Sequence, residues 1–427
     1  MSRDRSLMNE GDMLTQMSNV KSSYRAAKKT RFASRMQGVS LSGSGADYHY
    51  RTEREYLYMI ERARHFVRND PVVGQGITRL VSNVVQSGFR PDPKTGSAEL
   101  DAALKEEHEY WAESPDLCHS EGELTFNQIE RLALSSTITD GDIFTLLLND
   151  GSIQAVEGHR PRTPRGTKRN VVHGILLDKR IRRNEVWIAK EDLQYWQTPA
   201  RVNEIKPYVI RDARGNRQVL QMYFPKRFSQ RRGVTALAPV TDVIGMHDDL
   251  QFSTLVKAQL AALVVLLREQ DENSTPGAGG PALGAGAAGK QSEATEQTDA
   301  LFRPIPGIQT GLDVLLPKGE KAKGFTPNIP NAEFFPHTNL LLTFIAINLD
   351  MPVHMLLLDP SKTNFSGWRG AIDQARVRFR EMQTDMMGQF HRPVWNWRVR
   401  NLINTDSAIA RMAAQTGVRP FHHEWHL

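Results

Sequence analysis

One stretch of the chain, AQLAALVVLLR from Ala258 to Arg268, is apolar on nearly every side of the helix that it predicts. It forms the second half of a long helical stretch from Thr235 to Gln270, which opens after Gly233 and carries Pro239 in its first turn. A helix without a polar face is stable only where other protein covers it. The sequence therefore predicts a long helix that packs against further protein.

Amphipathic helices occupy the chain before this stretch. Apolar residues at three- and four-residue spacings predict a helix that begins at Glu53 and stops at Asn69-Asp70-Pro71. Asp70 can cap the next helix, Pro71 suits its first turn, and Gly88 suits its end. Further elements follow in order: helices over 100–113 and 126–138, and a buried strand over 143–148.

Strand patterns then replace helical ones. They run from Val171 to Phe224, with turn residues at 212–216. Helical periodicity returns over 339–349 and over 368–390, where the apolar residues again share one face. The alternation predicts an α/β fold in the broad sense, with helices and sheets in partly separate segments (α+β).

Composition shifts divide the chain into seven parts. They are a flexible N-terminal arm over 1–50, helices and a strand over 51–160, a β-rich basic segment over 161–232, a long helix over 233–270, a flexible low-complexity insertion over 271–300, an irregular return over 301–367, and a long helix with the C-terminal region over 368–427.

Length and cysteine content exclude several classes of protein. A chain of 427 residues is long enough for more than one hydrophobic core. Its single cysteine, Cys118, excludes an internal disulfide and fits a reducing compartment. The N-terminus lacks the apolar run of a signal peptide, and no stretch reaches the roughly 20 apolar residues that a membrane span needs. We expect a protein made in the cytoplasm, without a membrane partner.

Positive charge is concentrated in the β-rich segment. The whole chain carries a net charge of +6. Asp178 is the one acidic residue between Arg160 and Arg183, a span that contains the basic residues Arg160, Arg162, Arg165, Lys168, Arg169, Lys179, Arg180, Arg182 and Arg183. A second basic run contains Lys226, Arg227, Arg231 and Arg232. Two interpretations remain open here: a solvated loop, or contact with phosphate or an acidic protein surface.

No motif supports catalysis. The sequence from Gly284 to Lys290 approximates a phosphate-binding loop, but a Pro/Gly linker precedes it and Gln291 stands where Ser or Thr would hold magnesium. The C-terminal histidines His422, His423 and His426 lack the H-E-x-x-H spacing of a helical zinc site. We therefore expect no cofactor and no bound metal. The competing hypothesis is a metal-dependent nucleic-acid-processing enzyme, for which Asp140, Asp142 and these histidines are the candidate ligands. A helix-to-strand turn needs Asp and Gly for conformational reasons alone, so we favour a turn at Asp140-Gly-Asp142.

Four blocks of sequence together resemble the portal proteins of the lambda phage family. They are Arg62-Ala-Arg64 with Arg68-Asn-Asp-Pro71, 76–85 and Gly88-Phe-Arg-Pro91; 228–239; Leu316-Pro-Lys-Gly-Glu320 with Pro327 and Pro330; and 344–352 with Leu358 and Asn364-Phe-Ser-Gly-Trp-Arg369. The blocks occur in the family's order and are separated by variable stretches. Phe365-Ser-Gly departs from the family's aromatic residue followed by two small polar ones.

This resemblance implies a structural protein rather than an enzyme. It implies a portal fold with a wing over 51–160, stem helices including 233–270, a clip, and a partial helical crown within 368–427. It also implies a dodecameric ring in the virion, at one capsid vertex, with double-stranded DNA in its channel. Expected partners are the terminase large subunit, a head–tail adaptor, and the major capsid or scaffolding protein. We interpret the basic segment 161–232 as the candidate clip, with Arg162, Arg165, Lys168 and Arg169 facing the motor or adaptor.

A polar loop between two apolar helices is the candidate channel loop. Pro360 and Gly367 punctuate the span from Asp359 to Gly367, which contains too many turn formers to extend either helix. A loop between buried helices must reach water, and in a ring that water can fill the central channel. Lys362, Thr363 and Asn364 are then candidate DNA-facing residues, with an outer-surface loop as the alternative.

Overall fold

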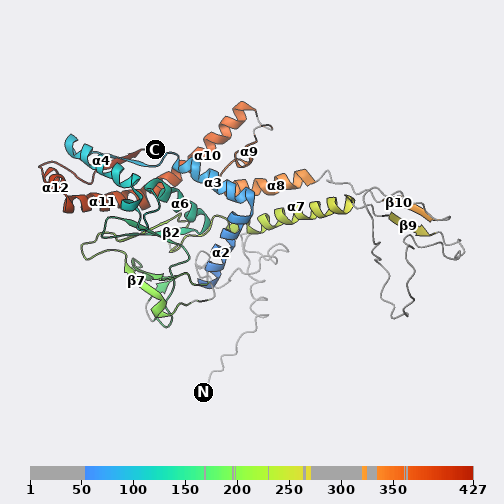
Figure 1. The fold of residues 1–427 in the computed structure, drawn as a ribbon, viewed down its shortest axis with the longest axis horizontal. Helices are drawn as coiled ribbons and strands as arrows, with labels where there is room; N and C mark the ends of the chain where they lie inside the picture. The colour runs from blue at the N-terminus through green and yellow to red at the C-terminus, as the bar shows by residue number, and fades with distance from the viewer. Residues whose placement is uncertain are drawn as a thin grey trace, which may run out of the picture. The chain divides into compact units, whose positions relative to one another are not determined.

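The computed structural model describes residues 53–426, apart from 168–169, 195–196, 198, 229, 263–265, 271–319, 325–333, 360 and 362–363. The expected N-terminal arm over 1–50 and the insertion over 271–300 lie outside the described residues. Residues Thr52–Leu427 form one unit, whose elements are labelled in Figure 1. No helix in the part of the chain that the structure describes is both long enough and apolar enough to cross a membrane.

Asp70 forms the corner between the first two helices, as its place before Pro71 predicts. Helix α2 (Glu53–Asn69) ends there and α3 (Pro71–Val85) begins. The Asp70 carboxylate accepts hydrogen bonds from the backbone N–H groups of Val72 at 2.8 Å and Val73 at 2.9 Å. These bonds satisfy two of the N–H groups that a helix leaves unpaired at its start. The predicted cap is confirmed.

Two antiparallel sheets follow the helices. The first has the strand order β3–β2–β8, from Ile153–Glu157, Asp142–Leu147 and Val219–Tyr223. The second has the order β4–β5–β6–β7, from Val171–Val172, Ile175–Leu177, Arg183–Ala189 and Ile205–Val209. The expectation of a β-rich segment within 161–232 is confirmed.

Strand β2 is buried on both faces, which joins the two sheets to the helices. Side chains alternate across a strand. Ile143 and Leu147 therefore enter the core formed with the helices, while Phe144 and Leu146 enter a second core with β5 and β6. Strand β8 also pairs with β2 directly. The β-rich segment 161–232 thus shares its core with residues 51–160.

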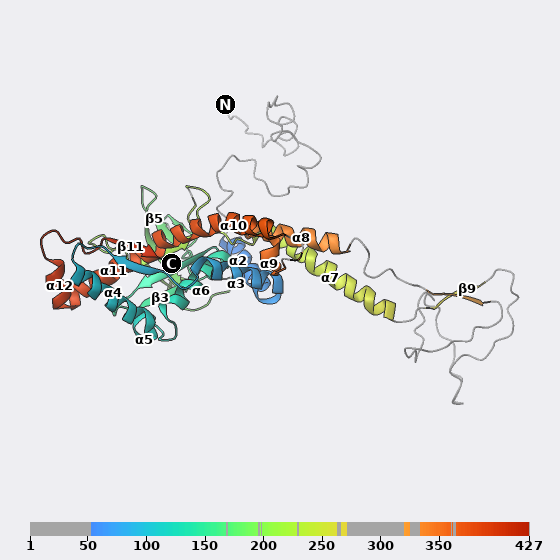
Figure 2. The ribbon, with the colours of Figure 1, turned by 90° about the horizontal axis from the view of Figure 1, so that it is seen from above.

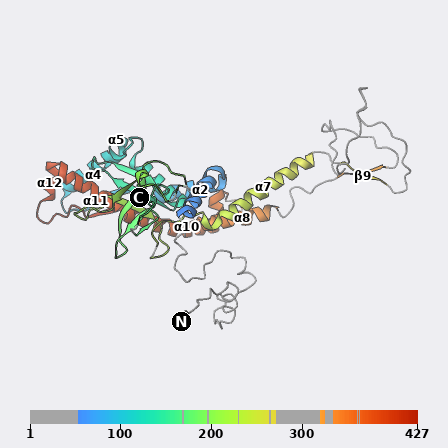
Figure 3. The ribbon, with the colours of Figure 1, turned by 90° about the horizontal axis from the view of Figure 1, so that it is seen from below.

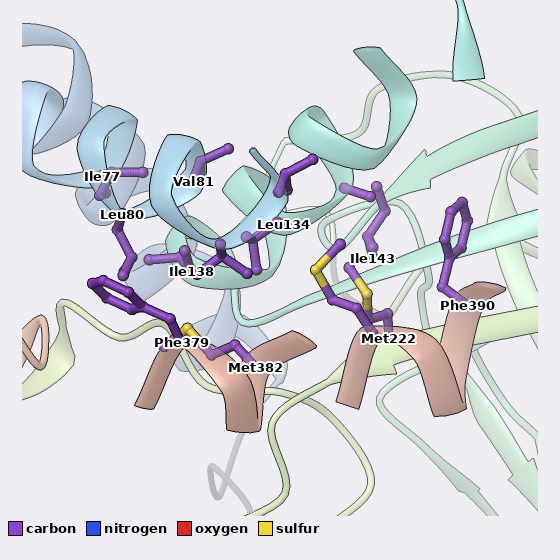
Figure 4. Close-up of a cluster of buried hydrophobic side chains, with 14 of the residues drawn as sticks. Ile77, Leu80, Val81, Leu134, Ile138, Ile143, Met222, Phe379, Met382 and Phe390 are labelled. Atoms are coloured by element: carbon purple, nitrogen blue, oxygen red, sulfur yellow. The ribbon is translucent and has the colours of Figure 1, made fainter. Parts of the chain in front are cut away.

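The main core lies where three helices meet β2 and β8 (Figure 4). Helix α6 (Phe126–Thr139) starts at a capping box formed by Thr125 and Gln128, and packs against α3. Helix α10 (Phe365–Met386) packs on α3 as well. The side chains that meet there include Ile77, Leu80, Val81, Leu134, Ile138, Ile143, Met222, Phe379, Met382 and Phe390.

The long helix predicted over 233–270 is shorter than expected. A 3₁₀ turn at Ala238–Val240 precedes α7 (Thr241–Ala262). Leu266–Gln270 is not helical but forms strand β9, which pairs antiparallel with β10 (Glu320–Gly324). The β-branched pair Val264-Val265 precedes β9, and such residues favour strand over helix. The expectation of a helix that continues to Gln270 was therefore wrong.

Helix α8 (Phe334–Asn348) runs beside α7, as Figures 1 and 2 show. It begins five residues before the predicted Asn339. Short helix α9 (Val353–Leu357) packs against α3 and α8. Beyond α10 the chain stays helical through a π turn at Met387–His391 into α11 (Arg392–Thr405).

The C-terminal residues return to the first part of the unit. Helix α4 (Ala98–Glu113), which leads into α5 (Pro115–Cys118), packs against α12 (Ser407–Ala413). Strand β11 (His423–His426) pairs antiparallel with β1 (Arg90–Pro93). Trp425 packs against the main core. The histidine-rich end is thus a strand in a two-stranded sheet.

Candidate functional site

The polar loop between α9 and α10 is shaped by its own side chains. Leu358 takes a left-handed conformation, with φ 54°, and ends α9. The Asp359 carboxylate accepts a hydrogen bond from the backbone N–H of Ser361 at 2.9 Å. The Asn364 side chain accepts one from the N–H of Gly367 at 2.7 Å and caps α10. These contacts confirm a turn-rich segment after α9. The loop is shorter than predicted, because α10 begins at Phe365 instead of Trp368 and includes Phe365–Gly367.

The candidate channel residues are only partly placed. Asn364 is exposed at the start of α10, although its side chain already serves as the helix cap. The neighbouring Phe365 is 79% exposed, which is unusual for so large an apolar side chain. Lys362 and Thr363 lie outside the described residues, so their role stays a prediction.

Helix α8, which precedes α9, is apolar on two opposite faces. Leu342, Ile345 and Ala346 are buried on one face of α8. Leu340, Phe344 and Ile347 occupy the other face, where Phe344 is 45% and Ile347 63% exposed. On α7, Phe252 and Leu255 are also exposed. A single subunit therefore leaves much of the apolar surface of this helix pair uncovered.

Arg162 lies inside the protein, contrary to the expectation that it faces a partner. Its side chain is 1% exposed. Its guanidinium donates hydrogen bonds to the backbone oxygens of His159 at 2.7 Å, Leu193 at 2.6 Å and Gln194 at 3.3 Å. Burial lowers its pKa to about 10. Arg162 therefore holds two loops together and cannot offer its charge to a partner surface.

The rest of the first basic run is divided between exposed residues and undescribed ones. The side chain of Arg165 is exposed, and its backbone N–H donates to the oxygen of Ala200 at 2.8 Å. Lys168 and Arg169 lie outside the described residues. Among the four basic residues proposed for partner contact, Arg165 is thus the one that the structure places at the surface.

The second basic run also contains a buried arginine. Arg232 is 3% exposed and forms a two-point pair with Asp142, with Nε 2.7 Å from Oδ2 and Nη2 2.9 Å from Oδ1. Its guanidinium carbon also lies 4.8 Å from the centre of the Tyr56 ring. Burial opposes the charge, but the Asp142 carboxylate outweighs it and raises the pKa of Arg232.

Asp140 forms a comparable pair with Arg64. Nε of Arg64 lies 2.8 Å from Oδ1 and Nη2 lies 2.5 Å from Oδ2. Burial raises the pKa of Asp140, and the guanidinium of Arg64 opposes that shift. Because Asp140 and Asp142 are each bound to an arginine, these carboxylates are not arranged to share a cation. They join α2 and the segment before α7 to the start of β2.

The terminal histidines do not form a joint site with these aspartates. His422 contacts the backbone oxygen of Lys94, and the ring of His423 lies against Trp395. His426, Glu424 and Asp92 do converge, with ligand atoms within 4.8 Å of one another. The Lys94 ammonium lies among them, 3.2 Å from Asp92 and 3.8 Å from Glu424. Hydrogen bonds from Lys94 and then His426 lower the pKa of Asp92.

Sequence reasoning missed both the buried ion pairs and this small cluster. Arg232 and Asp142 are 90 residues apart, and His426 and Asp92 are 334 apart. Neither pair can be recognised from nearby residues, because the partners come together only when β2 and β11 pair with other strands. The one local signal was Asp140-Gly-Asp142, which marks a turn that brings two carboxylates to the first sheet.

Comparisons with known proteins agree with this architecture. The family model described as phage portal protein, lambda family, matches residues 32–383. The chain resembles a chain in the neck of an empty gene transfer agent particle, with a TM-score of 0.52 and 10% identity over 84% of this chain and 90% of that one. It also resembles a chain in the virion of a native gene transfer agent particle, with a TM-score of 0.50 and 10% identity over 87% and 92%. No curated protein matches.

Proposed function

The chain belongs to the lambda family of phage portal proteins, and from this premise we propose how its copies act. They close into a ring at one capsid vertex, and double-stranded DNA enters and leaves the virion through the central channel. The family is structural, so the function is to hold, pass and retain DNA rather than to cleave it.

The observation that carries this proposal is the second apolar face of α8. Leu340, Phe344 and Ile347 lie on the side of the helix opposite Leu342, Ile345 and Ala346. A helix that is apolar all round is normally buried. Copies of one chain cover such surfaces in a ring when the contact joins two different faces, so that each subunit covers part of the next.

Two substitutions on that face test the ring. Phe344→Asp with Ile347→Asp places charges where a neighbour would bind, and truncating anchors of this kind costs about 2 kcal/mol or more each. We expect the variant to sediment as a monomer with unchanged circular dichroism. Val202→Asp changes an exposed apolar residue away from α8 and should leave rings intact. Rings from the doubly substituted α8 variant would refute the assigned contact.

The arrangement of the elements supports a revised assignment of the parts. The segment 161–232 was interpreted as the clip, but its strand β8 belongs to the same sheet as β2. We therefore assign 161–232 to the wing with 51–160. The adjacent helices α7 and α8 form the stem, and the clip is the segment that joins them, of which β9 and β10 are described.

The loop Asp359–Gly367 lines the channel in this proposal. It follows α9, and its last residues, Phe365–Gly367, form the first turn of α10. Lys362, Thr363 and Asn364 offer DNA sequence-independent contacts, and Lys362 supplies the positive charge. A single lysine per subunit, repeated around the channel, binds phosphates weakly enough for DNA to move.

Other molecules contact the ring at different stages. The terminase large subunit binds it during packaging and a head–tail adaptor binds it afterwards, while major capsid or scaffolding protein surrounds it. Rings assemble in the host cytoplasm before they become part of the virion. Arg165, Lys168 and Arg169 remain the basic residues proposed to meet phosphate or an acidic motor surface, and Arg162 leaves this set because it is buried.

A further inference from the structure

Four arginines converge on a hollow between the β7–β8 turn and α11. Arg211 and Arg217 come from the turn, and Arg392 and Arg400 come from one face of α11, with Asn396 between them. The hollow has a volume of about 330 Å³. We call it the arginine pocket. Guanidinium groups present several N–H donors in a planar fork, which suits carboxylates and phosphates.

The charge of the arginine pocket is not neutralised within the subunit. None of these four arginines forms an ion pair with a carboxylate among the described residues. Burial, and then the charges of Arg211 and Arg183, lower the pKa of Arg217. Asp212 lies near Arg400, but the side chain and backbone of Asn216 and the backbone of Arg214 already bind its carboxylate. The pocket is therefore prepared for an anion from outside.

An acidic surface lies on α4. Glu106, Glu109 and Glu113 fall within roughly 60° of one another around the helix, and all three are exposed. Tyr110, which is 65% exposed, lies beside them, and exposed tyrosines are typical of protein interfaces. The acidic surface continues through Asp116, Glu121 and Glu123, which are exposed too.

These carboxylates also lack partners within the subunit. None of Glu106, Glu109 and Glu113 forms an ion pair with a residue in the described part of the chain. Lys105 is the only lysine or arginine between residues 99 and 123. We call the exposed α4 residues Glu106, Glu109, Tyr110 and Glu113 the acidic face.

The two surfaces lie on different sides of α11, so one subunit cannot join them. Arg398 points toward α4, with its guanidinium 5.4 Å from the centre of the Trp111 ring. Arg400 is two residues further on, which places it about 160° around the helix from Arg398. Figures 2 and 3 show α4 and α5 along one side of the unit and α10 along the other.

We propose that the arginine pocket of one subunit binds the acidic face of the next copy of this chain. This inference rests on the proposed ring and names a charged contact that helps to close it. A ring of identical subunits needs two different, complementary surfaces on each copy. The arginine pocket and the acidic face supply opposite charges on opposite sides, and such complementarity selects the partner and its register.

Channel DNA is a weaker candidate for the arginine pocket. Helix α10 begins at Phe365, next to the proposed channel loop, and the helical run reaches Arg392 after 27 residue steps. At 1.5 Å per residue, the pocket lies roughly 40 Å along the helix from that loop. This separation favours a contact between proteins over a contact with DNA held at the channel loop.

A charge swap tests the proposal. The first variant carries Arg392→Glu and Arg400→Glu, the second carries Glu109→Arg and Glu113→Arg, and a third combines all four changes. The fraction of subunits in rings is measured by mass photometry across sodium chloride concentrations, and folding is checked by circular dichroism. Arg68→Glu is the matched control, because Arg68 is an exposed arginine far along the sequence from both surfaces.

We expect each two-residue variant to need at least about tenfold more protein to form rings at low salt, because like charges then face each other. The four-residue variant should return to within about threefold of the wild type, as the control should. Rings of unchanged stability in the arginine variant would overturn the proposal, and so would failure of the combined variant to recover. Intact rings that lose binding to labelled duplex DNA would instead assign the pocket to nucleic acid and also overturn it. Absence of rings in the wild type would contradict the proposed ring itself, whereas rings in the wild type that do not depend on these charges would contradict only this contact.

Discussion

At the scale of single residues, His108 shows how burial changes the chemistry of a side chain. It lies 3% exposed among Trp111, Phe126 and Trp395, and its Nδ1 has no hydrogen-bond partner within the described residues. Burial, together with the charge of Arg398, lowers its pKa from 6.5 to about 3. His108 is therefore neutral in the folded protein across the physiological range.

This shift predicts a pH-dependent loss of stability. The folded pKa lies below the unfolded one, so the full contribution is present above about pH 6.5 and declines as pH falls toward 3. One proton bound only by the unfolded state costs at most about 1.4 kcal/mol per pH unit. In His108→Phe, the free energy of unfolding measured with urea should fall less steeply than in the wild type between pH 6.5 and pH 4.

Exposed His65 provides the control for this measurement, because His65→Phe removes a histidine from the surface instead of the core. In His65→Phe, the free energy of unfolding should fall with pH as steeply as in the wild type. If the wild type and His108→Phe lost stability in parallel over this pH range, the buried neutral histidine would be contradicted.

Single residues also mark where sequence reasoning could not reach. Arg162 and Arg232 each belong to a run of basic residues that looks uniformly solvated in the sequence. The buried guanidinium of Arg162 binds backbone oxygens 31 and 32 residues away in the sequence. That of Arg232 binds Asp142, 90 residues away. Charge runs predict a basic segment correctly, but only tertiary contacts decide which of its arginines stay at the surface.

At the scale of elements, two glycines let the chain that leads to α7 touch the start of β2. Gly141 has φ 103°, a conformation that favours glycine. A Cβ added at Gly233 would lie 1.8 Å from the oxygen of Gly141, and one added at Gly141 would lie 2.6 Å from the backbone of Gly233. This close approach of the two backbones leaves no room for a side chain at either glycine. The Asp142–Arg232 pair lies directly beside it.

Gly233→Ala should therefore destabilise the protein by more than about 3 kcal/mol, because backbone must move and the buried ion pair must shift with it. Gly370→Ala is the control: it lies in α10 with open space around its Cβ position and should stabilise the helix by up to about 1 kcal/mol. Thermal unfolding of the two variants checks the pair. A melting temperature of Gly233→Ala equal to that of the wild type would show that the close approach is not required.

Local patterns predicted elements well where neighbouring residues decide the structure. The cap at Asp70, the helix of 126–138 and the strands of the β-rich segment all follow from spacing and turn residues. The helix over 233–270 was predicted too long because Leu266–Gln270 pairs with Glu320–Gly324, about 50 residues away. The histidine-rich end forms a strand because it meets Arg90–Pro93, more than 300 residues away. Contacts at such separations leave no periodicity to read.

At the scale of the whole molecule, the sequence predicted some parts of the candidate site and missed others. The loop between α9 and α10 was predicted from composition. Its turns and the Asn364 cap are confirmed, although α10 begins at Phe365, three residues before the predicted Trp368. The all-round apolar helix was predicted over 258–268, where the structure has the end of α7 and strand β9. The uncovered apolar surface lies instead on α8. The arginine pocket was not predicted, because its arginines come from a turn and a helix separated by about 180 residues.

The channel loop makes a prediction for the assembled particle. Lys362→Glu replaces a positive charge by a negative one at every subunit, so we expect rings of normal stability that package or retain less DNA. DNA content per particle, measured after nuclease treatment, checks this expectation, with Lys362→Arg as the variant that keeps the charge. Normal DNA content in Lys362→Glu particles would place the loop away from DNA.

The central claim is that this chain builds a ring around a channel, and the purified full-length protein tests it most directly. Negative-stain electron microscopy, at protein concentrations that favour assembly and over a range of salt, should show closed rings with a central hole. Class averages should contain one main number of subunits, which the family resemblance predicts to be twelve. A monodisperse monomer under all of these conditions would contradict the account.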